Sequence, residues 1–175
     1  MTIESQHEFE QMSAIGAIVA NCLAYMKAAA RPGLSTQELD ALGERYLHQC
    51  GARSAPKATY RFPGATCISV EKVAAHGIPG SYVLQEGDLI NIDVSAEKDG
   101  FFADNGESIV VGRGDATKEK LVSSVRHALT QGLGEARAGR KISEVGRVVE
   151  KCASARGLTV IRNLGGHGVG RSLHE

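Results

Sequence analysis

Residues 90–104 read INIDVSAEKDGFFAD, a stretch in which two alternating apolar runs flank the dipeptide Asp99-Gly100. Asp-Gly favours the positive φ angles of a tight turn, so the stretch predicts a β-hairpin over about residues 88–111. Each strand carries one carboxylate, Asp93 in the first and Asp104 in the second. If the loop has an even number of residues, the two Asp side chains share one face of the hairpin, opposed or one diagonal step apart.

Two carboxylates held that close repel each other and are costly to desolvate unless a cation lies between them. We therefore interpret Asp93 and Asp104 as half of a metal site, although a solvated strand face is the alternative for either residue. His167 lies between two glycines after a β-rich segment and is a third candidate ligand. Two carboxylates and an imidazole suit a divalent first-row metal. His76 and His174 are further candidates, and structural turn histidines are the alternative reading.

Composition narrows the function classes. The chain has 175 residues, with 20 basic and 20 acidic side chains. These charges cancel and predict neither direct nucleic-acid binding nor an anionic membrane surface as partner. We find no apolar run of the ~18–20 residues that span a bilayer, and the N-terminal MTIESQ is too polar for a secretion signal. Four scattered cysteines are typical of reduced thiols, so we expect a cytoplasmic protein.

Local start and stop signals predict the order helix, helix, strand, hairpin, helix, helix, strand, which is typical of the α+β class. Two capping boxes, Ser5–Glu8 and Ser35–Glu38, begin the first two helices. The expected elements besides the hairpin are helices over 5–30 and 35–51, a loop over 52–65, a strand over 66–70, a loop over 72–87, helices over 115–138 and 142–156, and a strand over 158–162.

A weak internal repeat accompanies this order. A shift of 106 residues places Arg31, Gly33, Glu38 and Gly51 on Arg137, Gly139, Glu144 and Gly157. The repeat predicts two similar αβ halves. A counterpart of the hairpin would fall near positions 194–217, beyond residue 175. We therefore expect an incomplete second half with an exposed apolar face.

Several motifs, in this order, resemble those of the bacterial type I methionine aminopeptidases. They are FPG at 62–64, CISV at 67–70, HGIP at 76–79, NIDV at 91–94, AD at 103–104 and GHGVGRSLHE at 166–175. The resemblance runs from about residue 8 to residue 175. It implies a pita-bread (creatinase/aminopeptidase) fold, in which two pseudo-symmetric αβ halves enclose a dinuclear metal cleft. Residues 1–175 would then form a single catalytic-type domain that lacks the C-terminal part of the second half.

The resemblance also implies roles for individual residues. Asp93, Asp104 and His167 would be metal ligands, with Asp104 bridging two divalent ions of cobalt, manganese, iron or zinc. His76 and His174 would be catalytic and substrate-binding residues that stabilise the tetrahedral intermediate as its oxyanion develops. The remaining implied substrate-binding residues, Phe62, Cys67 and Leu173, would line an apolar pocket for a methionine side chain.

The family removes the initiator methionine from nascent proteins when the next residue is small. The implied partner is therefore a nascent polypeptide or peptide that begins with Met, and the ribosome is a further candidate partner. The two glutamates that complete the family's site fall beyond residue 175, so we expect one metal to bind weakly and a second hardly at all. This leaves open a non-catalytic pita-bread protein that binds peptide N-termini. A proline-type peptidase on the same fold is a third hypothesis, which the short HGIP loop disfavours.

Overall fold

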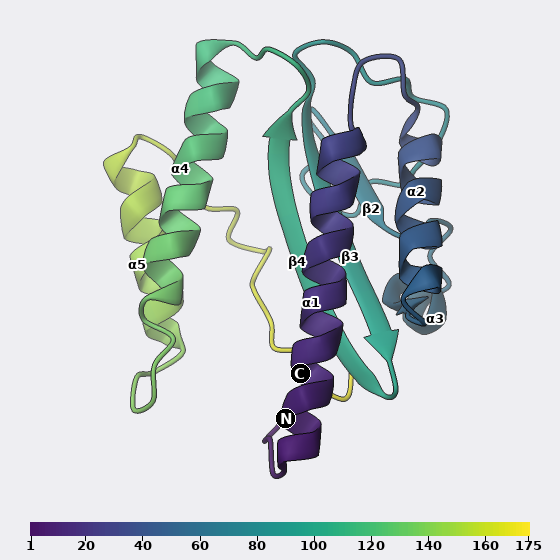
Figure 1. The fold of residues 1–175 in the computed structure, drawn as a ribbon. Coiled ribbons are helices and arrows are strands. Elements are labelled where there is room, and N and C mark those ends of the chain that lie inside the picture. The colour runs from purple at the N-terminus through teal and green to yellow at the C-terminus, as the bar shows by residue number, and fades with distance from the viewer. The chain divides into compact units, whose positions relative to one another are not determined.

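The computed structural model describes residues 1–175, and the chain divides into two compact units (Figure 1). The sheet unit comprises residues 1–114 and 167–175, and the helical unit comprises residues 115–166. Elements of the sheet unit are α1 (Gln6–Ala29), α2 (Thr36–Gln49), β1 (Arg53–Ser54), α3 (Ala55–Tyr60), β2 (Cys67–Val70), β3 (Leu89–Lys98) and β4 (Phe101–Val110). Elements of the helical unit are α4 (Ala116–Leu133) and α5 (Ser143–Ala155).

The predicted hairpin is the centre of the sheet. β3 pairs with β4 along one edge and with β1 and β2 along the other, and all pairs are antiparallel. Its two-residue turn is Asp99-Gly100, with φ angles of 53° and 82°. Both angles lie in the left-handed region that this turn type requires. The hairpin prediction is therefore confirmed, including its even-length loop.

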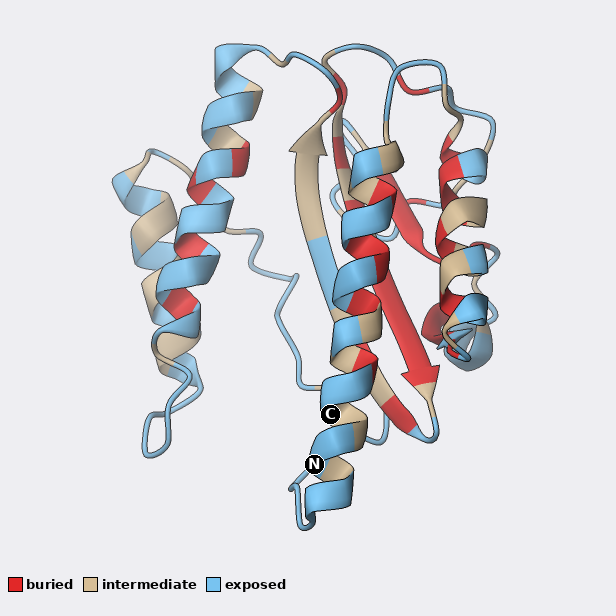
Figure 2. Cartoon of the chain, viewed as in Figure 1, coloured by how far each residue is buried: buried red, intermediate tan, exposed pale blue.

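The helices α1 and α2 cover this sheet because each has an apolar stripe, visible as the red side of α1 in Figure 2. The side chains that form the core are mainly aliphatic, and each contributes about 1.5–3 kcal/mol when fully buried. They include Ile15, Val19, Leu23 and Met26 of α1, Leu39 and Leu47 of α2, and Ile90, Ile92 and Val94 of β3.

The expectation that no segment is long and apolar enough to span a bilayer is wrong for α1. Residues Gln6–Ala29 form a helix that is long and apolar enough, by length and composition alone, to cross a membrane. Its core side chains nevertheless lie on the face that packs against the sheet, while Phe9 and Tyr25 are exposed. This one-sided burial is typical of a helix that covers a sheet.

The caps agree with the sequence in most respects. Ser35 and Glu38 form a complete capping box at the start of α2. Ser5 accepts a hydrogen bond from the Glu8 N–H, but the Glu8 carboxylate accepts from the Glu4 N–H instead of the Ser5 N–H. Both helices therefore begin where predicted.

Two predicted elements are wrong. Residues 52–65 are not a continuous loop, because β1 and α3 lie within them. Ser54 caps α3 through the Lys57 N–H, and Pro56 occupies the first turn, where its missing N–H costs nothing. Residues 158–162 form no strand, because no partner strand pairs with them and an unpaired strand is not stable in water.

The helical unit repeats the local geometry of α1 and α2. Gly33 and Gly139 have φ angles of 89° and 81°, and Gly51 and Gly157 have 68° and 73°. Each pair is separated by the 106-residue shift. α5 has nearly the bounds predicted for residues 142–156. α4 was predicted to reach residue 138 but ends at Leu133, because glycines at positions 132 and 134 disfavour a helix.

Candidate metal centre

The β3–β4 register places the two hairpin carboxylates on one face. Asp93 is opposite Gly106, and Asp104 is opposite Ser95, so the two Asp are one diagonal step apart. Both are partly buried, and their carboxyl groups share a hydrogen bond. The predicted shared face is therefore confirmed.

The electrostatics of the pair show the cost of this arrangement. Burial raises the pKa of Asp93 to about 7, and the negative charge of Asp104 together with the shared hydrogen bond acts in the same direction. Only His167 opposes the shift. A cation between the two carboxylates would offset the repulsion that contributes to this raised pKa.

His167 is brought to this pair by the C-terminal segment of the sheet unit. The Phe102 N–H in β4 donates to the Gly170 carbonyl at 2.8 Å, which ties the segment to the hairpin. The Nε2 atom of His167 lies 3.2 Å from Oδ2 of Asp104. Its Nδ1 donates to the Gly168 carbonyl at 3.0 Å, so Nε2 is the nitrogen left to face the carboxylates.

His174 belongs to the same cluster. Its ring centroid is 4.1 Å from that of His167. Its Nδ1 is 2.6 Å from the Tyr60 hydroxyl at the end of α3. The sequence did not identify Tyr60 as a site residue. Its place beside His174 depends on α3, and residues 52–65 were predicted to form a loop.

Ser95 is a second residue that the sequence reading missed. Its hydroxyl donates to Oδ1 of Asp104 at 3.0 Å, and it is buried. The signal was present, because Ser95 follows Asp93 by two residues and therefore shares its face of β3. It orients the Asp104 carboxylate, leaving Oδ2 toward His167.

The predicted pocket residues lie in the sheet unit, but only one is tied directly to the hairpin carboxylates. Cys67 is buried and pairs with Asp93 across β2 and β3. Burial raises the pKa of its thiol to about 12, and the charges of Asp93 and Asp104 add to the shift. Cys67 is therefore a neutral thiol and not a nucleophile. Leu173 is buried and Phe62 is half-buried.

His76 lies in the loop after β2 with an exposed side chain and a φ of 54°. No hydrogen bond or ring contact joins its imidazole to the other site residues. The structure thus brings together Asp93, Asp104, His167 and His174, and holds His76 on the neighbouring loop.

The donors suit a divalent metal in chemical type, since hard carboxylate oxygens adjoin an imidazole whose other nitrogen is fixed by a carbonyl. They are not arranged around one point, because no group of three His, Cys, Asp or Glu side chains forms a metal-binding cluster. The observed contact is instead the direct one between His167 and Asp104. The residues therefore fit the metal by chemistry, and binding would separate this pair.

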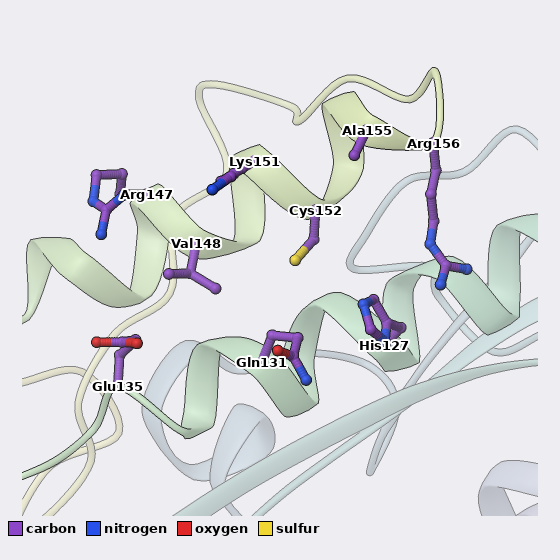
Figure 3. Close-up of a pocket in the computed structure, with 9 residues that line it drawn as sticks. All are labelled: His127, Gln131, Glu135, Arg147, Val148, Lys151, Cys152, Ala155 and Arg156. Carbon is purple, nitrogen blue, oxygen red and sulfur yellow. The ribbon is translucent and has the colours of Figure 1, made fainter.

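A cavity of about 460 Å³ lies elsewhere, in the helical unit (Figure 3). His127 and Gln131 line it from α4, and Arg147, Lys151 and Cys152 line it from α5. None of the predicted site residues contributes to it. The cavity is therefore not part of the candidate metal centre.

Comparisons with known sequences identify the family. The model of metallopeptidase family M24 matches residues 10–175. Methionine aminopeptidase 2 of Bacillus subtilis is 47% identical over the whole chain, which spans 71% of that protein. Methionine aminopeptidase of Staphylococcus epidermidis is 45% identical, and the chain spans 70% of it. The chain belongs to metallopeptidase family M24, and the relatives it resembles there are bacterial methionine aminopeptidases, as the motifs predicted.

Solved structures give the same result. The crystal structure of methionine aminopeptidase from Rickettsia prowazekii superimposes with a TM-score of 0.94 at 30% identity, over all of this chain and 71% of that one. Prolidase from Pyrococcus furiosus has a TM-score of 0.86 at 21% identity, over 99% of this chain and 50% of that one, and shows the fold alone. The predicted α+β pita-bread fold is confirmed. The chain is a metallopeptidase by family, and metal dependence is a property of that family.

Proposed function

We propose that this chain removes N-terminal methionine from peptides and nascent proteins with the cluster of the sheet unit. The observation that carries the proposal is the pair Asp93 and Asp104 with His167 against it. Two partly buried carboxylates this close, with the pKa of Asp93 raised, form a site that favours positive charge. The names of the relatives supply the substrate, since they are methionine aminopeptidases.

Asp93, Asp104 and His167 are the residues that would hold the metal, and Asp104 is the ligand that we expect two ions to share. Ser95 and the Gly168 carbonyl orient two of these ligands. A divalent ion of cobalt, manganese, iron or zinc would supply an activated water and a polarised carbonyl. We expect these three donors by themselves to hold a first ion weakly and a second hardly at all.

The histidines would act on the substrate. The Tyr60 hydroxyl lies 2.6 Å from Nδ1 of His174 and orients its ring, so Nε2 would be the nitrogen that donates a hydrogen bond to a developing oxyanion. His76, on an exposed loop beside β2, would contact the peptide from a second direction. Phe62, Cys67 and Leu173 would offer the apolar surface that suits an unbranched thioether.

The substrate is a peptide or nascent polypeptide that begins with Met. The ribosome is a candidate partner for the second case, and the cytoplasm is the compartment in which nascent chains are met. We also propose that residues 1–175 act as one catalytic-type domain.

Hydrolysis of the tripeptide Met-Gly-Gly by the purified chain tests this function. After treatment with chelator, release of free methionine should require added Mn²⁺ or Co²⁺. Asp104→Asn should lower the rate by about 100-fold or more, because a ligand is lost. Asp99→Asn is the matched control, since it changes a carboxylate in the exposed turn of the same hairpin and should leave the rate within about twofold.

A peptide that stays intact with either metal would overturn the proposal. If the chain then bound the peptide with an affinity that chelator does not change, the non-catalytic alternative would be supported. Metal-dependent release that Asp104→Asn does not alter would instead refute the assigned ligand.

A further inference from the structure

The loop that carries His76 is tied to β2 by one buried hydroxyl. The Gly77 N–H donates to Oγ of Ser69 at 3.0 Å. Beside it, the Ile68 N–H donates to the Gly77 carbonyl at 2.9 Å. Ser69 is only 2% exposed, and its side chain makes no other hydrogen bond. The hydroxyl therefore has a single role, which is to hold the residue that follows His76.

His76 needs such a restraint. Its φ of 54° places a non-glycine residue in the left-handed region. This conformation costs on the order of 1 kcal/mol and persists only where neighbouring contacts impose it. The imidazole is exposed, so burial of the His76 side chain does not impose it. The restraint must come through the backbone.

Gly77 supplies the backbone contact. Its main chain lies directly on β2, and a Cβ atom there would come within 2.2 Å of the Ile68 carbonyl oxygen and 2.6 Å of Cα of Ser69. No side chain fits in that space. The close approach lets the Ser69 hydroxyl reach the Gly77 N–H, and together these contacts set the direction in which the preceding residue leaves the sheet.

The other end of the loop is held as well. Thr36, at the first position of α2, donates to the Gly80 carbonyl at 3.0 Å and accepts from the Gly80 N–H at 2.9 Å. Cys67, on the same strand as Ser69, pairs with Asp93 in the hairpin. One short strand thus links the His76 loop to the candidate metal centre.

We infer that Ser69 is the positioning residue of His76, holding Gly77 so that the His76 imidazole keeps its place relative to the hairpin carboxylates. The inference rests on the proposed function, which gives His76 its contact with substrate. Ser69 does not itself touch the substrate, and its effect on the reaction passes through His76.

The first test measures the placement and needs no turnover. Amide hydrogen exchange at Gly77 should be about tenfold faster in Ser69→Ala, since one buried hydrogen bond is lost. Ser69→Thr retains the hydroxyl and should restore slow exchange. Ser124→Ala is the matched control, because Ser124 is also 2% exposed and its hydroxyl donates to a backbone carbonyl within the helical unit. Unchanged exchange at Gly77 in a folded Ser69→Ala chain would overturn the inference.

The second test measures the reaction on Met-Gly-Gly with Mn²⁺. Ser69→Ala should lower kcat about tenfold with KM within about twofold, because a displaced group loses orientation and not affinity. Ser69→Thr should recover most of the rate. In a His76→Ala background, Ser69→Ala should cause no further loss, since the residue through which it acts is gone.

The outcomes distinguish failure of the inferred role of Ser69 from failure of the proposed function. A further tenfold loss in the His76→Ala background would show that Ser69 acts on the fold and would overturn the inference. If His76→Ala by itself left kcat unchanged, the proposed role of His76 would fail. If no variant, including the natural chain, released methionine, the proposed function would fail, while the exchange at Gly77 would still decide whether Ser69 holds the loop.

Discussion

Two helix pairs in this chain have similar local geometry and very different burial. α1 and α2 in the sheet unit correspond to α4 and α5 in the helical unit through the 106-residue shift, with glycines of positive φ at matching places. α1 and α2 each bury five residues. α5 buries none, and the exposed apolar residues of the helical unit include Val125, Leu129, Leu133 and Ile142.

The difference separates local backbone interactions, which form each helix, from tertiary packing, which buries it. Caps and glycines act within a few residues, so they end a helix in the same way in either unit. Burial of an apolar stripe needs a partner surface, which β3 and its neighbours provide only in the sheet unit. The two pairs are therefore alike as helices and unlike as parts of a core.

The largest expected difference is between two leucines at matching positions. Leu23 in α1 is 3% exposed, and Leu129 in α4 is 52% exposed. Leu23→Ala should lower the free energy of unfolding by about 3 kcal/mol, because it leaves a cavity in the core. Leu129→Ala should cost less than about 1 kcal/mol. Urea denaturation of the two variants checks this, and equal losses would show that the comparison is wrong.

A second difference between the units is a pH dependence of stability, which Asp93 gives to the sheet unit. The folded state raises the pKa of Asp93 from its ordinary value of 3.8 to about 7, so it binds the Asp93 proton more tightly than the unfolded state does. The stability from this group is complete below about pH 4 and is lost as the pH rises toward 7.

Denaturation at pH 5 and pH 8 in the presence of chelator, for the natural chain and for Asp93→Asn, isolates this contribution. The natural chain should lose stability relative to Asp93→Asn as the pH rises, because asparagine carries no proton to release. Parallel pH profiles for the two proteins would contradict the assignment.

The smallest effect tests the caps. Ser35 caps α2 with a complete capping box, whereas Ile142 at the start of α5 provides no side-chain cap. Ser35→Ala should cost about 1 kcal/mol. Ile142→Asp should stabilise α5 by about 0.5 kcal/mol, since it adds an acceptor and a negative charge at a helix N-terminus. Amide exchange within each helix measures both changes, and a gain at α5 equal to the loss at α2 would show that burial does not limit the effect of a cap.

Much of the candidate site could be predicted from short-range patterns. The shared face of Asp93 and Asp104 follows from strand alternation and a two-residue turn, and the register confirms it. The motifs predicted the family, which the comparisons confirm. Tyr60 is hydrogen-bonded to His174, 114 positions away, and Ser69 to Gly77, 8 positions away. No local pattern specifies such pairs, because they form only where separate elements pack together.

The sequence by itself determined where α1, α2 and α5 begin and end, where the hairpin turns, and which face of the hairpin carries its carboxylates. These features depend on backbone preferences and on side chains a few residues apart. Only the tertiary structure decided that His167 faces Asp104 and that residues 158–162 form no strand. It also decided which of two similar helix pairs became a core. Such outcomes depend on a partner surface brought close by the whole chain, and the burial of apolar area rewards only the pair that finds one.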